Sequence, residues 1–448
     1  MRIAFITAGA AGMYCGSCMR DNTLVIALRE LGHDALLIPA YMPIKVDEPD
    51  ASVKRVFFGG INIYLEQKFW LFRHTPRFLD RLFNFRWLLK WVSRFAVRAK
   101  YSEQGNLTIS MLEGTHGKQA KEVEKLVEYL ADEKPDVVLF TNALLSGVIP
   151  TVKKALGVPV FVTLQGDDIF LDELPAVERA RCCELIRDNC QSVDAFISTS
   201  AYNADHMASY LSVPRERMCV VQPGINLAGH GGPAAPRGDR PLTIGYFARI
   251  CPEKGFHRAV EAFIKLRQMP DAPAAKLKAS GWLGENNRSY YDDQVKRLEA
   301  AGLIGDFEHV ECPTHDDKVR FMRSIDVLCV PTVYCEPKGL YVLEAWANGV
   351  PAVLPAHGAF TELIESTGGG LLVAPDSIDE LADGLQMMLT DHTFRDNAGR
   401  AGEAAVRTRF SADAMARETV ALLSRFAGEV MSDELRVMSQ TPNTPAPP

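Results

Sequence analysis

The feature of this sequence that most constrains the fold is a series of short, wholly apolar segments separated by helix-like stretches. In the first half of the chain these segments are 2–8, 34–40, 136–142, 158–165, 194–200 and 218–223. Strands are apolar throughout when a parallel sheet is covered on both faces, whereas half-exposed strands alternate apolar and polar residues. Helical patterns such as 23–33 lie between them. The series therefore predicts βαβ units and an α/β fold with a doubly wound parallel sheet.

The series is interrupted once and then begins again. Residues 229–241 are dense in Gly and Pro, which is typical of a linker. The apolar segments beyond it are 241–248, 276–282, 307–312, 326–332, 351–356 and 370–374. We therefore predict two Rossmann-like domains, 1–228 and 242–430, with a disordered tail at 431–448. Ligands of such sheets bind at the carboxyl ends of the strands, so both domains are expected to face one cleft.

Composition excludes several classes of protein. The 448 residues carry a formal net charge of −7, which argues against a nucleic-acid partner. No apolar run approaches the length of about 20 residues that spans a bilayer. The apolar stretch within residues 1–9 is short and interrupted by Gly, unlike a signal peptide. Ten cysteines in a chain of this length lack the density of a disulfide scaffold, so we expect a reducing cytoplasm.

The stretch 331–363 contains two glutamates near the start of a predicted helix. Glu336 and Gly339 lie in a loop after a strand, and a helix that begins around Leu340 carries Glu344. The free N–H groups of a helix start suit a phosphate, and a nearby carboxylate can accept hydrogen bonds from ribose hydroxyls. The alternative is that both are surface glutamates, placed favourably for the helix dipole.

Two further loops follow strands and suit a phosphorylated ligand. Arg249 and Lys254 lie in the loop after 241–248, where two cations can clamp a diphosphate; the alternative is a solvated basic loop. The loop 8–23 lacks the G-x-G-x-x-G spacing of dinucleotide sites, but its glycines permit close backbone approach, most plausibly at Gly16.

Together these motifs resemble the retaining, nucleotide-sugar-dependent glycosyltransferases of the two-domain GT-B fold, the group called family 4. EPKGLYVLE (336–344) resembles their E-x7-E signature, and RICPEK (249–254) resembles their R-x4-K phosphate clamp. CGSCMRDNTLVIALRELGH (15–33) is similar to their glycine loop and first helix, and 409–426 to their final helix, which packs back on the molecule.

The resemblance implies a role for each motif residue. It puts Glu336 beside the donor sugar and Glu344 on the ribose. Around the diphosphate it places Arg249, Lys254, Gly339 and Leu340. It also implies a backbone contact at Gly16, and it places Gln165 near the transferred sugar, where the family often has His. The usual aromatic residue before Gly339 is Lys338 here. We expect these groups to line the cleft rather than to lie in a core. Such enzymes typically need no metal, so none is expected, and the nucleotide sugar is a substrate rather than a cofactor.

The function that we predict is transfer of a hexosyl group, with retention, from a nucleoside-diphosphate sugar to an unidentified glycan or glycolipid. The resemblance places donor phosphates in the C-terminal domain and the acceptor mainly in the N-terminal domain. The alternatives are a sugar-nucleotide epimerase or phosphorylase of the same fold, and a non-catalytic protein that binds sugar nucleotides.

Three weaker patterns accompany these motifs. Residues 66–100 hold nine Lys or Arg and two acids, a pattern of either an interfacial helix on an anionic membrane or a helix that covers a sheet beside an acceptor groove. Cys15 and Cys18 open a helix, which suits redox chemistry or a metal, but no second such pair accompanies them. Asp167 and Asp168 are interpreted as acids at a helix start rather than as metal ligands.

Overall fold

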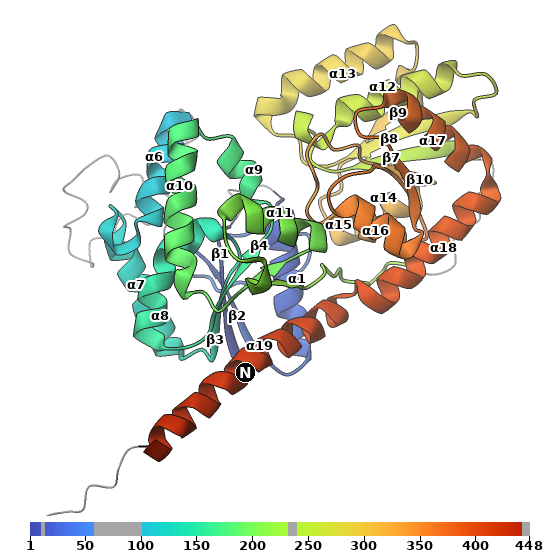
Figure 1. Cartoon of the computed structure of the whole chain (residues 1–448). Coiled ribbons are helices and arrows are strands. Elements are labelled where there is room, and N and C mark those ends of the chain that lie inside the picture. Colours follow the sequence, from blue (N-terminus) through green and yellow to red (C-terminus); the bar gives the residue numbers. More distant parts are fainter. Residues whose placement is uncertain (10–13, 58–100, 232–239, 441–448) are drawn as a thin grey trace, which may run out of the picture.

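The computed structural model describes residues 1–9, 14–57, 101–231 and 240–440, which form two α/β domains (Figure 1). The basic segment 66–100 and most of the predicted linker lie outside the described residues. The sheet of the N-terminal domain consists of β1 (Arg2–Thr7), β2 (Asp34–Pro39), β3 (Val137–Phe140), β4 (Val160–Leu164), β5 (Ala195–Ser198) and β6 (Met218–Val220). Their order is β2-β1-β3-β4-β5-β6, and every neighbouring pair is parallel.

The C-terminal domain has a second parallel sheet. Its strands are β7 (Leu242–Phe247), β8 (Ala275–Ser280), β9 (Phe307–His309), β10 (Val327–Cys329), β11 (Ala352–Pro355) and β12 (Gly370–Val373). Their order is β12-β11-β10-β7-β8-β9. Each of the twelve strands falls within or one residue beside a predicted apolar segment, so the predicted fold class of two doubly wound parallel sheets is confirmed.

Helices cover both faces of each sheet, as parallel strands require. Those of the N-terminal domain are α1 (Gly16–Glu30), α6 (Tyr101–Leu112), α7 (Ala120–Glu133), α8 (Ile149–Leu156), α9 (Asp167–Asp172), α10 (Ala176–Asn189) and α11 (Ala201–Leu211). Those that follow are α12 (Phe256–Gln268), α13 (Arg288–Ala300), α14 (His315–Arg323), α15 (Leu340–Trp346), α16 (Ala359–Thr367), α17 (Ile378–Thr390), α18 (His392–Arg409) and α19 (Ala412–Gln440). None of the helices in the described part of the chain has the length and apolar character needed to cross a bilayer.

The last helix joins the two domains. It leaves the C-terminal domain and runs along the N-terminal one (Figure 1), where Met415 and Leu423 are buried in the same cluster as Phe5 of β1 and Leu24 of α1. Residues 431–440 continue α19 instead of beginning a disordered tail, because Pro first interrupts the helix-forming sequence at Pro442. Residues 441–448 lie outside the described residues.

Candidate active site

The predicted site loops lie at the points where each sheet changes direction. In the C-terminal domain β10 and β7 are neighbours although they are not consecutive, and the loops after them carry Glu336 and Arg249. In the N-terminal domain β1 and β3 have the same relation, and the chain after β1 leads to Gly16. Ligands of open parallel sheets bind at such switch points. The strand order therefore places the three loops where a ligand of both domains is expected.

Lys254 and Glu336 form a buried ion pair within the C-terminal domain. The Lys254 ammonium lies 2.6 Å from Oε2 of Glu336, and their side chains are 12% and 4% exposed. The same oxygen accepts hydrogen bonds from the hydroxyls of Tyr334 and Tyr341, at 2.8 and 3.0 Å. Gly255 fixes the loop that carries Lys254, since it has φ +73° and a Cβ there would lie 1.8 Å from the carbonyl oxygen of Pro331.

Glu336 is held in its ionised form. Burial by itself would raise the pKa of Glu336, but the Lys254 ammonium and the surrounding hydrogen bonds outweigh it and hold that pKa at about 2. Oε1 accepts from the backbone N–H groups of Lys338 and Gly339, both at 3.3 Å. A carboxylate offers about four acceptor positions, so these donors occupy them all. Glu336 therefore orders the loop before α15, and the expectation of an open cleft position is wrong for it.

Arg249 is the more available of the two cations. Its side chain is 38% exposed, and its ion pair with Glu253 is long, at 3.4 Å. A half-exposed guanidinium with one weak partner can turn its fork toward an incoming diphosphate at small cost. The structure thus separates two positions that the sequence could not distinguish, a partly exposed cation at Arg249 and a buried cation paired with Glu336 at Lys254.

Glu344 takes part in an ion-pair triad that connects the two domains. Its Oε1 lies 2.8 Å from Nζ of Lys318 on α14, and the same Nζ lies 2.6 Å from Oδ2 of Asp47 in the N-terminal domain. All three side chains are less than a tenth exposed. Burial would lower the pKa of Lys318, but the two carboxylates outweigh it and raise that pKa above its ordinary value. Glu344 is therefore buried rather than open to the cleft.

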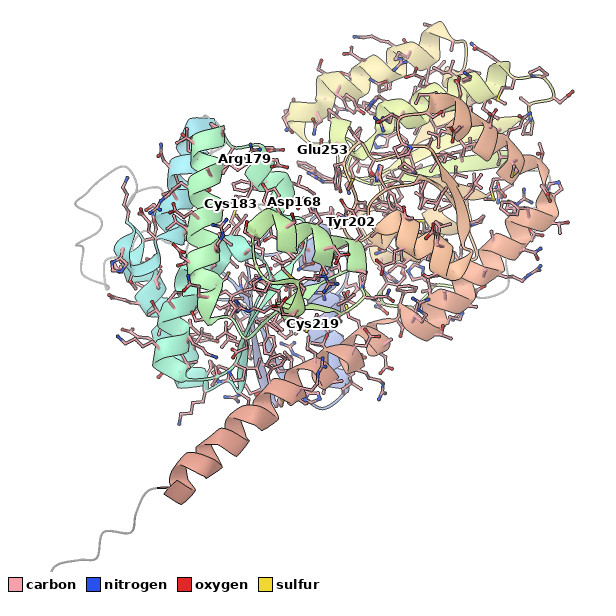
Figure 2. The ribbon with its side chains drawn as sticks, viewed as in Figure 1. Asp168, Arg179, Cys183, Tyr202, Cys219 and Glu253 are labelled. Carbon is pink, nitrogen blue, oxygen red and sulfur yellow. The ribbon has the colours of Figure 1, made fainter. Side chains whose placement is uncertain are left out.

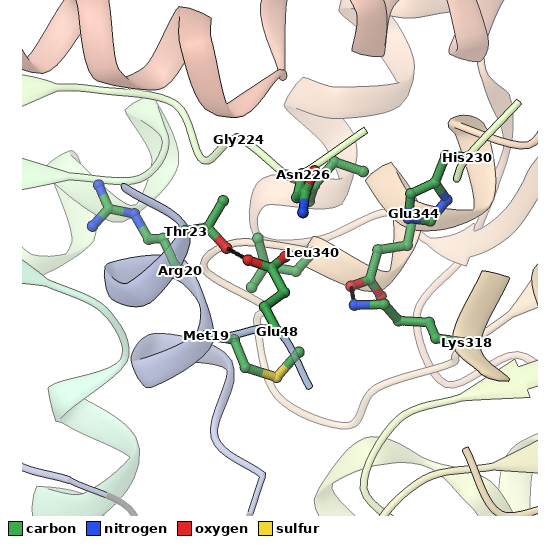
Figure 3. A pocket seen from close by; sticks show the side chains of 11 residues that line it. Met19, Arg20, Thr23, Glu48, Gly224, Asn226, His230, Lys318, Leu340 and Glu344 are labelled. Carbon is green, nitrogen blue, oxygen red and sulfur yellow. Dashed lines mark hydrogen bonds and ion pairs between the residues drawn. The ribbon is translucent and has the colours of Figure 1, made fainter. Parts of the chain in front are cut away.

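A small cavity lies beside this triad, between the domains. Met19, Arg20, Thr23 and Glu48 line it from the N-terminal domain, and Lys318, Leu340 and Glu344 line it from the C-terminal domain (Figure 3). Its volume of about 20 Å³ holds one water molecule and no nucleotide. In this arrangement the carboxylate of Glu344 is closed to a ligand of nucleotide size.

Lys338 connects the loop before α15 to the N-terminal domain. Its ammonium donates to Oγ of Ser17 at 2.7 Å and to the backbone carbonyl of Gln165 at 3.0 Å. The amide of Gln165 in turn donates to Oδ1 of Asp21 and to the carbonyl of Thr141. Oε1 of Gln165 and Oδ2 of Asp21 are buried without a hydrogen-bond partner among the described residues. Unpaired buried acceptors are costly, so these two atoms are suited to a ligand hydroxyl.

The predicted backbone positions meet across the domain boundary. Gly339 has φ +70° and precedes the first residue of α15, Leu340, which confirms the predicted helix start. Gly16 begins α1, and a Cβ built on it would lie 3.7 Å from Cδ1 of Leu340. The glycine loop of one domain and the helix start of the other are therefore neighbours in this closed arrangement.

Asp167 and Asp168 form the first turn of α9, as interpreted from the sequence. Asp167 accepts hydrogen bonds from the backbone N–H groups of Ala143 and Gln165. Asp168 lies 3.0 Å from Nε2 of His206 on α11; Figure 2 labels Asp168 in the N-terminal domain and Glu253 in the C-terminal domain. Among the described residues no group of three or more His, Cys, Asp or Glu is placed to hold a metal ion.

The contact between His206 and Asp168 predicts a pH dependence of stability. The hydrogen bond to Asp168 raises the pKa of His206 above 6.5. The contribution of this ion pair to the stability of the fold is therefore complete below pH 6.5, and it is lost as pH rises through the raised pKa of His206. Because the pair is partly exposed, we expect it to add about 0.5 kcal/mol to the free energy of unfolding. The melting temperature of the wild type should exceed that of His206→Gln at pH 5.5, and the two should converge by pH 8.5; a constant difference would contradict the ion pair.

Comparison with known families identifies the chain. The model for glycosyl transferases group 1 matches residues 234–405, and the model for the glycosyl transferase 4-like domain matches residues 22–224. The chain belongs to the group 1 glycosyltransferases. It is 25% identical to an uncharacterized glycosyltransferase of Methanocaldococcus jannaschii over 67% of this chain and 78% of that one. It is also 26% identical to glycogen synthase of Mycobacterium tuberculosis over 50% of this chain, but spans only 53% of that enzyme.

Solved structures agree with the fold. HepE from Anabaena, solved with UDP and glucose, superimposes with a TM-score of 0.67 and 16% identity, covering 95% of this glycosyltransferase and all of HepE. Sucrose-phosphate synthase from Thermosynechococcus elongatus gives a TM-score of 0.68 and 17% identity, covering 96% of this chain and all of that one. The fold is therefore GT-B, with two parallel-sheet domains, as the sequence predicted.

Sequence reasoning missed the residues that pair with the predicted ones. Asp47 and Lys318 hold Glu344, and Arg20 and Asp21 are buried in the first turns of α1. The one available signal was the run of charged residues directly after the glycine loop, where a helix packed on a sheet is otherwise apolar. The roles of the sequence-predicted site residues in chemistry stay predictions.

Proposed function

We propose that this glycosyltransferase uses a nucleoside-diphosphate sugar and transfers a hexosyl group with retention, without a metal. The observation that carries the proposal is the convergence of Arg249, Lys254 and the start of α15 at the switch point of the C-terminal sheet. Departure of a nucleoside diphosphate develops negative charge, and fixed cations and backbone N–H groups at that point stabilise it. Retention rests on the family resemblance alone.

The domains are expected to open for the donor and to close around it. The cavity beside Glu344 is too small for a nucleotide, whereas contacts such as those of Lys318 with Asp47 hold the boundary together. Closure excludes water that would otherwise hydrolyse the donor. We propose that the acceptor binds on the N-terminal side, near the unpaired acceptors of Gln165 and Asp21.

The first experiment is a thermal-shift screen against UDP, GDP, ADP and dTDP. A nucleotide present at 100 times its dissociation constant stabilises the folded protein by about 2.7 kcal/mol. UDP is the first candidate, since HepE was solved with it. The matched nucleotide sugar, labelled in the sugar, then separates the alternatives. Transfer with a retained anomeric configuration supports the proposal, whereas an epimerised donor, or binding without turnover, contradicts it.

Glu344→Ala should weaken donor binding more than turnover. A carboxylate that binds ribose hydroxyls does so alike in the ground and transition states, so its loss raises KM. Hydrogen bonds to a charged group are worth about 1.5–3 kcal/mol, which corresponds to a KM increase of about ten- to hundredfold. Glu365→Ala, an exposed glutamate on α16, is the control. An unchanged KM with lowered kcat would contradict the ribose role.

We further propose a cytoplasmic protein whose acceptor is a glycan or a glycolipid. A relative of 28% identity, over 51% of this chain and 65% of that one, is a lipopolysaccharide core biosynthesis mannosyltransferase of Rhizobium meliloti. Contact of the segment 66–100 with an anionic membrane stays a prediction. Each basic residue near such a surface contributes about 1 kcal/mol to the free energy of membrane binding. Co-sedimentation with anionic vesicles at low salt, lost at high salt, is the expected result; protein that stays in the supernatant at low salt contradicts it.

A further inference from the structure

Two cysteines flank Gly16 and Ser17 at the start of α1. Cys15 is the residue before the helix, with an extended backbone (φ −119°, ψ 122°), and its carbonyl accepts the first helical hydrogen bond, from Met19 N–H at 3.0 Å. Cys18 lies one turn later and is buried, 4.0 Å from Oγ1 of Thr7. Cys15 is half-buried. Of the two residues, Cys15 is therefore partly exposed and Cys18 is buried.

The surroundings of Cys15 favour a thiolate. It lies at a helix N-terminus, where the backbone dipoles favour negative charge. Lys338 reaches this helix start from the other domain and donates to Ser17, which lies between the two cysteines. The neighbouring Cys18 and the Lys338 ammonium outweigh the effect of burial and lower the pKa of Cys15 well below its ordinary value. The neighbouring Cys15, together with burial, raises the pKa of Cys18.

We propose that Cys15 and Cys18 are a redox-active pair and that the start of α1 is a site of reversible disulfide modification. A partly exposed cysteine at a helix start, followed one turn later by a buried second cysteine, is the arrangement of an attacking and a resolving cysteine. None of the other eight cysteines has this arrangement at a described helix start. The site is separate from the transfer chemistry proposed above, although it adjoins the donor loop.

The oxidation of Cys15 and Cys18 is a thiol–disulfide exchange in which a low-molecular-weight disulfide is the oxidant. The Cys15 thiolate attacks one sulfur of that disulfide, forms a mixed disulfide and releases one thiolate. The released thiolate takes the proton of Cys18, whose sulfur then attacks Sγ of Cys15 and releases the second thiolate. The protein loses two electrons to the oxidant, and a disulfide between Cys15 and Cys18 replaces the two thiols.

The disulfide would alter the candidate donor site. The ring that it closes contains Gly16 and Ser17, so the backbone N–H groups at the helix start lose freedom to adapt to a ligand. Oxidation also removes the negative charge that faces Lys338. We expect weaker donor binding after oxidation, a consequence that rests on the proposed function, whereas the disulfide itself does not.

The test follows the tryptic peptide 3–20, which contains both cysteines and no other. The full-length protein is incubated with oxidised glutathione, alkylated with iodoacetamide and digested. We expect this peptide unalkylated and about 2 Da lighter than its dithiol form, with recovery of two alkylation sites after dithiothreitol. In Cys18→Ser the expected product is a stable glutathione adduct on Cys15, and in Cys15→Ser no adduct on Cys18.

Native alkylation provides a second measurement that needs no variant. At pH 6.5 Cys15 should react with iodoacetamide about tenfold faster than Cys335, an exposed thiol in the same protein. The substitution Lys338→Met should slow the alkylation of Cys15 and leave the alkylation rate of Cys335 unchanged. Two carbamidomethyl groups on peptide 3–20 after oxidation, or a rate at Cys15 no greater than at Cys335, would overturn the proposal. A disulfide that forms in a protein to which no nucleotide binds would support the redox pair and count against the proposed function alone.

Discussion

Arg249→Ala is expected to lower kcat by about 10²–10³ and to leave the melting temperature unchanged. Charge on the leaving diphosphate grows as the bond to the sugar breaks, so removing one fixed cation costs more in the transition state than in the ground state. Stability is spared because Arg249 is 38% exposed and makes only a long ion pair with Glu253. Steady-state kinetics with the matched donor, together with thermal melts, measures both effects.

Two further variants sharpen this result. Arg297→Ala removes an exposed arginine of the same domain that pairs with Glu261 at 3.2 Å, and it should leave both kcat and stability unchanged. Arg249→Lys keeps the charge but loses the planar fork, so its kcat should fall between those of the wild type and Arg249→Ala. A turnover of Arg249→Ala within about threefold of the wild type would exclude the guanidinium from leaving-group stabilisation.

Lys254→Met is expected to destabilise the C-terminal domain by about 3–5 kcal/mol, in addition to lowering kcat. The substitution leaves the carboxylate of Glu336 buried without its ammonium, and breaking a buried pair from one side has a cost of this size. Lys265→Met is the matched control, because Lys265 is 44% exposed and its ion pair with Asp379 lies on the surface. Chemical unfolding at pH 7 should show a change below about 1 kcal/mol for the control.

The loss in Lys254→Met should also depend on pH. The folded-state pKa of Glu336 is about 2, below its ordinary value of 4.5, so its contribution is complete above pH 4.5 and is lost as pH falls toward 2. Without Lys254, burial raises the pKa of Glu336, and protonation then relieves the unpaired charge. The difference in unfolding free energy between wild type and variant should therefore shrink as pH is lowered from 7 to 4.

A double variant separates loss of the pair from loss of packing. Lys254→Met combined with Glu336→Gln leaves no unpaired carboxylate, so it should recover at least about 1 kcal/mol relative to Lys254→Met. It should not recover activity, since the cation is still missing. If the double variant is as unstable as the sum of the two single ones, the two residues do not interact and the buried ion pair is contradicted.

The sequence by itself determined the architecture. The mainly apolar segments became the twelve strands, and most of these strands, such as β1 and β3, are apolar and buried because helices cover both faces of a parallel sheet. The helix start at Leu340 followed from a glycine before an apolar run, and Gly339 indeed has φ +70°. Arg249 and Lys254 could be placed at a strand's carboxyl end for the same reason. These features depend on residues that are neighbours in the chain, so the sequence pattern alone predicts them.

Only the tertiary structure decided which charges are available. Lys318 lies 26 residues before Glu344, and Asp47 lies in the other domain, yet the three form one buried triad. Lys338 reaches Ser17 and Gln165 across the domain boundary. Such pairings depend on the order of the strands and on the closure of two domains, neither of which leaves a periodic pattern in the sequence. An ion pair needs only two side chains within 4 Å, and chain separation does not constrain it, so burial and pairing at this site came from the fold.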